Sequence, residues 1–166
     1  MPDRPFDDCY WVERGRLLAG EYPVTRDPAT AGERLRALAR AGVTVFVDLT
    51  EEGELEPYAH LVPPPAEHLR FPIQDMSVPS SPEAMAKILD GLDAHTGAGS
   101  LVYVHCWGGV GRTGTVVGCW LARRRGGPAA LEELERLWAE CLKSKTWRSP
   151  ETPEQRGYIL EWEVGR

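Results

Sequence analysis

The 166-residue sequence has no excess of positive charge, because 19 Lys and Arg residues stand against 25 Asp and Glu, for a formal net charge of −6. It has no apolar run long enough to span a membrane, and its first five residues lack the apolar stretch of a signal peptide. Its four cysteines form no CxxC pair and no other metal-ligand spacing. These absences predict no nucleic-acid partner, no membrane partner, no metal and no cofactor.

What the sequence does contain is a ten-residue stretch, residues 105–114, between a predicted buried strand and a predicted helix. The strand (100–104) is rich in β-branched and aromatic residues, and the helix follows at 115–123. Within the stretch, a cysteine is followed by a glycine-rich turn, and the turn ends at an arginine. A glycine-rich turn at a helix start directs backbone N–H groups and the positive end of the helix dipole inward, which creates an oxyanion site.

The side chains of this stretch suit nucleophilic attack on a tetrahedral dianion. The thiolate of Cys106 is the expected nucleophile, and the inward N–H groups together with Arg112 favour this anion over the thiol. Arg112 also offers two parallel N–H donors to phosphate oxygens, a geometry that lysine lacks. Thr113 is expected to hold the thiolate with its hydroxyl, and His105 to orient the loop by hydrogen bonding. The other expected phosphate-binding positions are Trp107, Gly108, Gly109, Val110 and Gly111.

The spacing of Cys106 and Arg112, with a histidine before and Thr-Gly after, resembles the active-site signature of cysteine-dependent protein tyrosine phosphatases. The whole chain is similar to a small dual-specificity-type member of that superfamily, of the compact bacterial kind. The resemblance implies hydrolysis of phosphotyrosine, and also of phosphoserine or phosphothreonine, through a phosphocysteine intermediate. It further implies an aspartate general acid on a separate loop and no metal. A thiolate nucleophile needs a reducing compartment, so we expect the cytoplasm.

Asp75 is the candidate for the general acid. Cleavage of a phosphate ester leaves an alkoxide or phenoxide, which needs a proton from a carboxylic acid on a loop that closes over the site. Asp75 lies in such a loop, at a distance before Cys106 similar to that in the dual-specificity family. The competing carboxylates Glu83, Asp90 and Asp93 fall on the next predicted helix. A loop aspartate is otherwise usually a turn former.

Two further features each have two interpretations. Thr152 and Gln155 have the spacing of a capping box, which is a complete structural explanation of the glutamine. The family resemblance implies another role, because some tyrosine phosphatases carry a glutamine at a comparable junction that places the hydrolytic water. The acidic run at 51–56 either lines the substrate cleft or is a solvated charge run, and the second is the commoner case.

Strands alternate with helices along the predicted order, and three consecutive helices end the chain. This order predicts an α/β fold with a central, mostly parallel twisted sheet of about five strands and helices on both faces. The site is expected at the carboxyl end of the 100–104 strand, where such sheets bind ligands.

The length predicts one phosphatase domain over residues 1–166, with residues 1–9 as a loose N-terminal arm. Asp27-Pro28 is a helix-start signal, and the helix is expected to end at about Ala41.

Three functions remain open from the sequence. The first is a phosphatase acting on a phosphorylated protein or an aryl phosphate. The second is a phosphoinositide or inositol phosphate phosphatase on the same scaffold, which calls for extra cations that residues 107–111 do not supply. The third is a non-catalytic phosphate-binding module, which would normally have lost the nucleophile, the arginine or the acid.

Overall fold

The computed structural model describes residues 4–166 of the chain. Its centre is a five-stranded sheet with the order β1-β2-β5-β3-β4. The strands are β1 (Cys9–Glu13), β2 (Leu17–Gly20), β3 (Val43–Asp48), β4 (Glu67–Arg70) and β5 (Leu101–His105). The β1–β2 pair is antiparallel, whereas β2, β5, β3 and β4 run parallel to one another.

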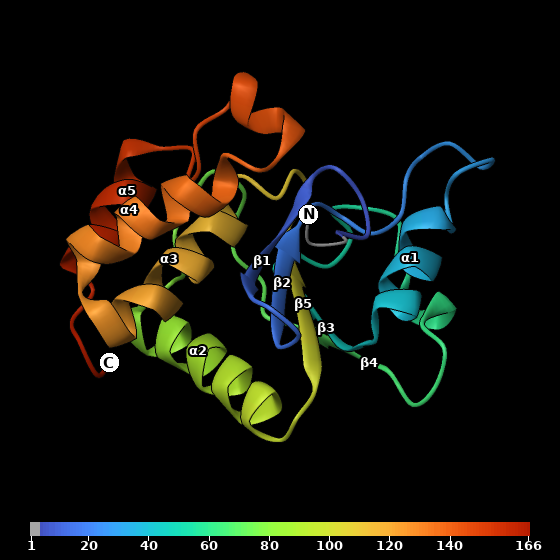
Figure 1. Cartoon of the computed structure of the whole chain (residues 1–166), viewed down its shortest axis with the longest axis horizontal. Helices are drawn as coiled ribbons and strands as arrows, with labels where there is room; N and C mark the ends of the chain where they lie inside the picture. The colour runs from blue at the N-terminus through green and yellow to red at the C-terminus, as the bar shows by residue number, and fades with distance from the viewer. Residues whose placement is uncertain (1–3) are drawn as a thin grey trace.

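The helices cover both faces of this sheet (Figure 1). One side carries α1 (Glu33–Ala41). The other side carries α2 (Pro82–Gly97), α3 (Arg112–Arg125), α4 (Gly127–Trp138) and α5 (Pro153–Glu161). Two short 3-10 helices, η1 (Ala59–Leu61) and η2 (Leu142–Lys145), lie in connections. This arrangement confirms the predicted α/β class, with a mostly parallel five-stranded sheet and three consecutive helices at the end.

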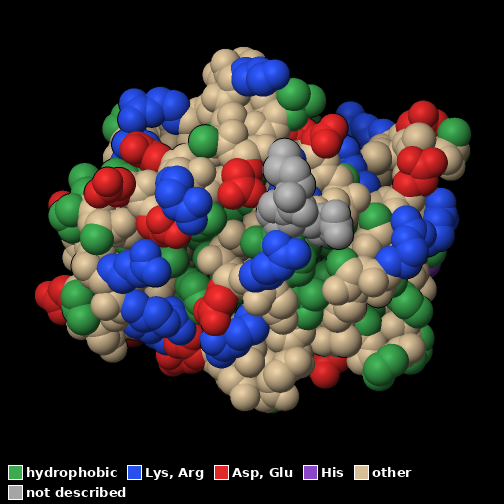
Figure 2. All heavy atoms as spheres, viewed as in Figure 1, with side chains coloured by type: hydrophobic (Ala, Val, Ile, Leu, Met, Phe, Trp, Pro, Cys, Tyr) green, Lys and Arg blue, Asp and Glu red, His purple; other side chains and the backbone are tan. Residues whose placement is uncertain are grey.

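None of the helices in residues 4–166 combines the length and the apolar character that crossing a membrane requires. On the face drawn in Figure 2, basic and acidic side chains lie next to one another. Elsewhere in the chain's ion pairs, Arg148 and Arg156 both contact Glu135, at 3.6 and 2.6 Å.

Strand β5 lies in the middle of the sheet and is buried along its whole length. Because successive side chains of a strand point to opposite faces, Val102 and Val104 pack into the core beneath α2–α5. Leu101 and Tyr103 pack into the second core, which contains the buried leucines of α1. The two cores hold β5 from both sides, and this fixes the position of the residue that follows it, Cys106.

The expected start of the first helix is wrong. Helix α1 begins at Glu33, with Gly32 as its N-cap, rather than at Asp27-Pro28. The Oδ1 of Asp27 accepts a hydrogen bond from the N–H of Ala29 at 2.9 Å. The aspartate therefore closes a local turn, the other common use of this residue type.

The N-terminal arm expected over residues 1–9 joins the fold at its end. Cys9 is buried and is the first residue of β1. Phe6 packs edge-on against Tyr103, with 6.2 Å between the ring centroids. Residues 1–3 of the expected arm lie outside the described residues.

Candidate active site

The 106–112 loop connects the carboxyl end of β5 to the amino end of α3. Cys106 follows β5 directly and its side chain is 3% exposed, whereas Arg112 opens α3 and is 1% exposed. Strands β2 and β3 flank β5 and run parallel to it. The loop therefore lies at the carboxyl edge of the parallel strands, where open α/β sheets bind ligands.

Neighbouring groups bind the carbonyls of this loop and leave its N–H groups available. The bonded carbonyl oxygens and their donors are Cys106 O with His105 Nδ1, Trp107 O with Tyr22 N, Gly108 O with Lys143 Nζ, Val110 O with Ser149 Oγ, and Gly111 O with Thr115 N. By contrast, the N–H groups of residues 107–111 donate to no residue that the structure describes. Adjacent unpaired N–H groups of this kind form a nest for an anion.

Gly109 lets the loop approach the end of β2. Its φ is +72°, in the left-handed region, and a Cβ there would lie 2.5 Å from the carbonyl carbon of Gly20. Both the conformation and the contact require glycine. The approach brings the Trp107 carbonyl within 2.8 Å of the Tyr22 N–H.

The guanidinium of Arg112 is held by two other loops. Its Nη1 and Nη2 donate to the two carboxylate oxygens of Glu54 at 2.8 and 2.6 Å, and Nη1 also donates to the carbonyl of Ile73 at 3.0 Å. Burial acts to lower the pKa of Arg112, but the hydrogen bonds with Glu54 and the nearby negative charges together outweigh it, and the pKa is raised. The Nε of Arg112 and the Oγ1 of Thr113 are buried without a partner among the described residues. The Nε of Arg112 therefore remains for a ligand. The hydroxyl of Thr113, which was predicted to hold the Cys106 thiolate, makes no hydrogen bond to the sulfur among the described residues.

Glu54 is a site residue that the favoured interpretation of the acidic run at 51–56 did not predict. The favoured interpretation of residues 51–56 was a solvated charge run, and for Glu54 it is wrong. The hydrogen bond from Arg112 lowers the pKa of Glu54, so the pair stays charged. A signal was present, because this run follows strand 43–48, whose carboxyl end lies next to that of β5.

Asp75 lies at the rim of the same site. Its Oδ1 lies 3.1 Å from Nη2 of Arg112 and accepts from the N–H of Met76 at 2.9 Å. Its side chain is 53% exposed, and Met76 has a φ of +63°, which is unusual for a residue other than glycine. The structure thus brings the predicted acid, the predicted nucleophile and the predicted arginine together around one pocket.

That pocket has a volume of about 260 Å³. Its lining includes the three candidates Asp75, Cys106 and Arg112 and several apolar side chains. Trp107, Trp147 and Met76 line it and are each at least half exposed, at 53%, 50% and 50%. The backbone holds Trp147, whose carbonyl accepts from the Nε1 of Trp138 at 2.7 Å. Large apolar side chains gathered at a polar floor are typical of a ligand site.

His105 is fully buried, and burial lowers its pKa to about 4, so the ring is neutral at pH 7. Its Nδ1 lies 3.0 Å from the Cys106 carbonyl, which only accepts, so Nδ1 carries the proton. Its Nε2 then accepts from the hydroxyl of Tyr58 at 2.5 Å. Both ring nitrogens are engaged, which suits a residue that orients the loop.

Gln155 is fully buried and forms the predicted capping box with Thr152. Its Oε1 accepts from the N–H groups of Glu151 and Thr152 at 3.1 and 3.0 Å. Its Nε2 donates to the carbonyl of Ser77 at 3.0 Å, which ties the loop of Asp75 to the start of α5. The water-placing role stays a prediction.

The other three cysteines are free and buried. Burial raises the pKa of Cys9 to about 11 and that of Cys141 to about 12, and it raises the pKa of Cys119 further. All three remain thiols at neutral pH. None of them adjoins the nest of N–H groups as Cys106 does.

The family comparison decides the class of this domain. The family described as "Swiss Army Knife protein, DSP-PTPase phosphatase domain" matches residues 7–151. The chain belongs to this family. Membership confirms the superfamily that the cysteine–arginine signature indicated.

Relatives of this DSP-PTPase domain include "Putative tyrosine phosphatase 067L" of Invertebrate iridescent virus 3, which is 40% identical over 116 residues, 64% of this chain and 42% of that protein. "Uncharacterized protein MJECL20" of Methanocaldococcus jannaschii is 35% identical over 94 residues, 57% of this chain and 58% of that protein. The chain spans about half the length of the curated relatives it matches. These viral and archaeal relatives give no support to the expected bacterial kind.

Among solved structures, the crystal structure of Tk-PTP in the active form is similar to this DSP-PTPase domain. The two are 29% identical, and the match covers 94% of this chain and 96% of that chain with a TM-score of 0.75.

Proposed function

We propose that this domain hydrolyses phosphoric monoesters through a phosphocysteine intermediate, and that it acts on phosphotyrosine and also on phosphoserine or phosphothreonine in proteins. The observation that carries the proposal is the set of unpaired donors around one thiol. Five loop N–H groups (107–111) and the Nε of Arg112 have no partner within residues 4–166 and can bind an oxyanion beside Cys106. A reducing compartment such as the cytoplasm suits a nucleophile that must stay unoxidised.

In the first step, the Cys106 thiolate attacks phosphorus, and the S–P bond forms as the P–O bond to the leaving group breaks. The N–H groups of 107–111 and Arg112 bind the remaining phosphate oxygens and stabilise the charge that develops on them. Asp75 gives its proton to the departing oxygen. In the second step, Asp75 takes a proton from the water that attacks phosphorus, the S–P bond breaks, and the hydroxyl of Thr113 stabilises the returning thiolate.

The contact between Asp75 and Arg112 links substrate binding to acid catalysis. Glu54 and the carbonyl of Ile73 occupy three of the terminal N–H groups of Arg112, and Asp75 occupies the Nη2–H that remains. Two phosphate oxygens that dock on the Nε and Nη2 edge replace Asp75 at Nη2. The exposed carboxyl group is then released toward the leaving group.

The pocket walls favour an aryl ester among the possible substrates. Trp107, Trp147 and Met76 offer large apolar surfaces above the floor, which suit the ring of phosphotyrosine. An inositol phosphate or phosphoinositide substrate remains the alternative on this scaffold. It is weaker, because residues 107–111 contribute no cationic side chain to bind further phosphates.

Hydrolysis of a small aryl phosphate by wild type and by Cys106→Ser, with reductant and chelator present, tests the proposal. A serine hydroxyl is not ionised at neutral pH, so we expect turnover to fall below detection while the phosphate-like oxyanion tungstate still binds. The matched control Cys141→Ser should keep wild-type turnover. Steady turnover by Cys106→Ser would rule out the thiolate mechanism, and an inactive wild type would favour a phosphate-binding module.

A second variant tests the aryl preference. We expect Trp147→Ala to lower kcat/KM for a phosphotyrosine peptide by about threefold to tenfold, mainly through KM, because a ring contact is made equally before and during reaction. The phosphoserine version of the same peptide should change little. Leu142→Ala, which is 54% exposed outside the pocket, is the control. Equal losses on both peptides would contradict the role of Trp147.

A further inference from the structure

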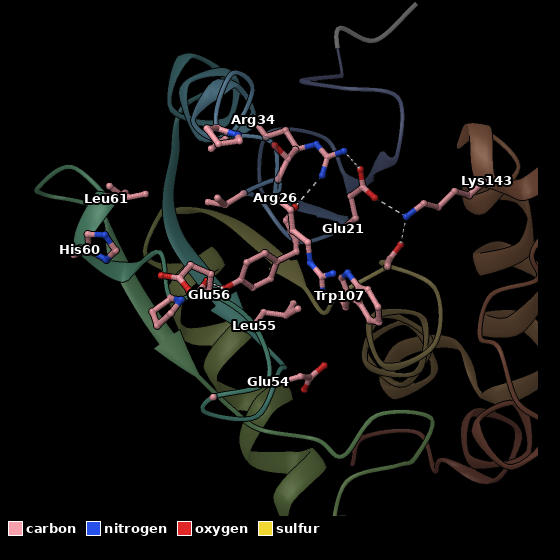
Figure 3. Close-up of a pocket in the computed structure, with 18 residues that line it drawn as sticks. Glu21, Arg26, Arg34, Glu54, Leu55, Glu56, His60, Leu61, Trp107 and Lys143 are labelled. Carbon is pink, nitrogen blue, oxygen red and sulfur yellow. Dashed lines mark hydrogen bonds and ion pairs between the residues drawn. The ribbon is translucent and has the colours of Figure 1, made fainter.

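A second and larger cavity, whose lining residues are drawn in Figure 3, adjoins the catalytic pocket. Its volume is about 1210 Å³, and it shares Trp107, Gly108 and Lys143 with the pocket of Cys106. Its other walls come from residues 21–34 and 53–61. A phosphate ester held at Cys106 therefore lies next to this space, with Trp107 lining both cavities. Pockets for drug-sized ligands measure about 300–1,000 Å³, so the cavity has room for a segment of polypeptide.

One wall of this cavity carries more positive than negative charge. The carboxylate of Glu21 binds both Arg34 and Lys143, and Figure 3 shows it between these two cations. Lys143 also donates to the carbonyl of Gly108 at 2.9 Å, which leaves one of its three N–H donors available. Two cations thus share a single carboxylate next to the catalytic pocket.

Arg26 adds a third cation at the boundary between the two cavities. Its guanidinium carbon lies 5.8 Å from the centre of the Trp107 ring, within the range of a cation–π contact. Its side chain is exposed, and no carboxylate within residues 4–166 forms an ion pair with it. Arg26 is therefore held in place by an aromatic ring and keeps its donors for an anion.

The remaining wall limits how much negative charge a ligand can carry. Glu54 is neutralised by Arg112, but Glu56 is exposed and lines the same cavity. A polyanion such as a multiply phosphorylated ring would meet the charge of Glu56 as well as the shared carboxylate of Glu21. A single carboxylate on a peptide avoids this repulsion and reaches the cationic wall alone.

We propose that this cavity binds the polypeptide that flanks the phosphorylated residue, and that Arg26 selects an acidic side chain close to that residue. The inference rests on the proposed phosphatase function and adds a substrate preference to it. It assigns Trp107 a second task, because the ring separates the two cavities and carries the guanidinium of Arg26.

The test compares phosphotyrosine peptides that differ in one flanking position, with Glu or Gln placed in turn at each of the neighbouring positions. We expect wild type to prefer Glu over Gln at one or two positions by about threefold to fivefold in kcat/KM, the range of a partly solvated ion pair. Arg26→Ala should bring this ratio to about one, through KM. Arg26→Lys should keep part of it, and Arg26→Glu should make a Lys-containing peptide the better substrate. Raising the salt concentration should reduce the wild-type ratio.

Arg14→Ala is the matched control. Arg14 is also exposed, but it lies in the turn before β2, which faces the amino end of β5 and thus the opposite edge of the sheet. It should leave the Glu-to-Gln ratio unchanged. A wild-type enzyme that hydrolyses both peptides equally, or a preference that survives Arg26→Ala, would overturn the subsite alone. A phosphoinositide in vesicles that is hydrolysed faster than every peptide, with the rate dependent on Arg26, would also overturn it. Failure to hydrolyse any phosphate ester would instead overturn the proposed function.

Discussion

His105 and Arg112 stand at the two ends of the 106–112 loop, and both are buried ionisable residues. On the side of His105, the polar groups are bonded in a closed network. His105 binds Tyr58 and the Cys106 carbonyl, and Asp48 accepts from His68 at 2.9 Å and from Thr50. Burial acts to raise the pKa of Asp48, but these hydrogen bonds outweigh it and lower the pKa.

On the side of Arg112, the network is incomplete. The Nε of Arg112 and the Oγ1 of Thr113 have no partner in the described part of the chain, although both are buried. A buried polar group without a partner costs about 1–3 kcal/mol, and at these two residues, which adjoin the nest of loop N–H groups, an anion bound in the site would supply the missing bonds. The comparison teaches that the closed side holds the loop in shape and the open side is set for an anion.

The largest expected effect comes from Arg112→Lys. Lysine keeps the charge but cannot bind Glu54 and two phosphate oxygens with one planar group, so we expect kcat/KM to fall by about 10²–10³-fold. Steady-state hydrolysis of a small aryl phosphate measures this loss. Arg123→Lys, at the other end of α3 and paired with Asp93, is the control. Near-normal activity in Arg112→Lys would refute bidentate capture of phosphate. It would also refute the conclusion that the open side is set for an anion.

Asp75→Asn should have the next largest effect. We expect a loss of about 10²-fold for esters with poor leaving groups and a much smaller loss for good ones, because only the former need a proton. The fall in rate with rising pH that a general acid imposes should weaken as well. Asp90→Asn, an exposed carboxylate on α2, serves as the control. Equal losses for good and poor leaving groups would count against Asp75 as the acid.

On the open side, the sequence predicted those site residues that belong to one continuous segment of the chain. Cys106, Arg112 and Thr113 lie within one loop and one helix start, so their proximity followed from the strand–turn–helix order. Asp75 was placed by the family resemblance, because its contact with Arg112 joins separate loops.

The parts that the sequence did not predict depend on distant segments meeting. Glu54 contacts Arg112 across a sequence separation of 58 residues, and a charge run has no periodicity that marks which carboxylate turns inward. Trp147 reaches the pocket only because the connection after α4 folds back onto it. The late start of α1 has another cause, since Asp27 can close a turn as well as cap a helix.

The last and smallest expected effect, on stability, comes from His105→Gln, which tests the closed side. Burial lowers the pKa of His105 from 6.5 to about 4, so between these pH values the unfolded chain binds a proton that the folded protein does not. Stability should therefore fall as the pH is lowered through this window, by an amount on the order of 1–2 kcal/mol between pH 7 and pH 5.

Urea unfolding of wild type and His105→Gln at pH 7, 6 and 5 measures this effect. The variant should be less stable at pH 7, because it loses the bonds to Tyr58 and the Cys106 carbonyl, but its stability should fall less with pH. The carboxylates, including Asp48, titrate in both proteins, so the difference between the two curves isolates His105. Parallel curves would show that the ring accepts a proton in the folded state. The closed side would then contain a group that changes its charge in the folded protein, and the contrast between a fixed scaffold and an open anion site would fail.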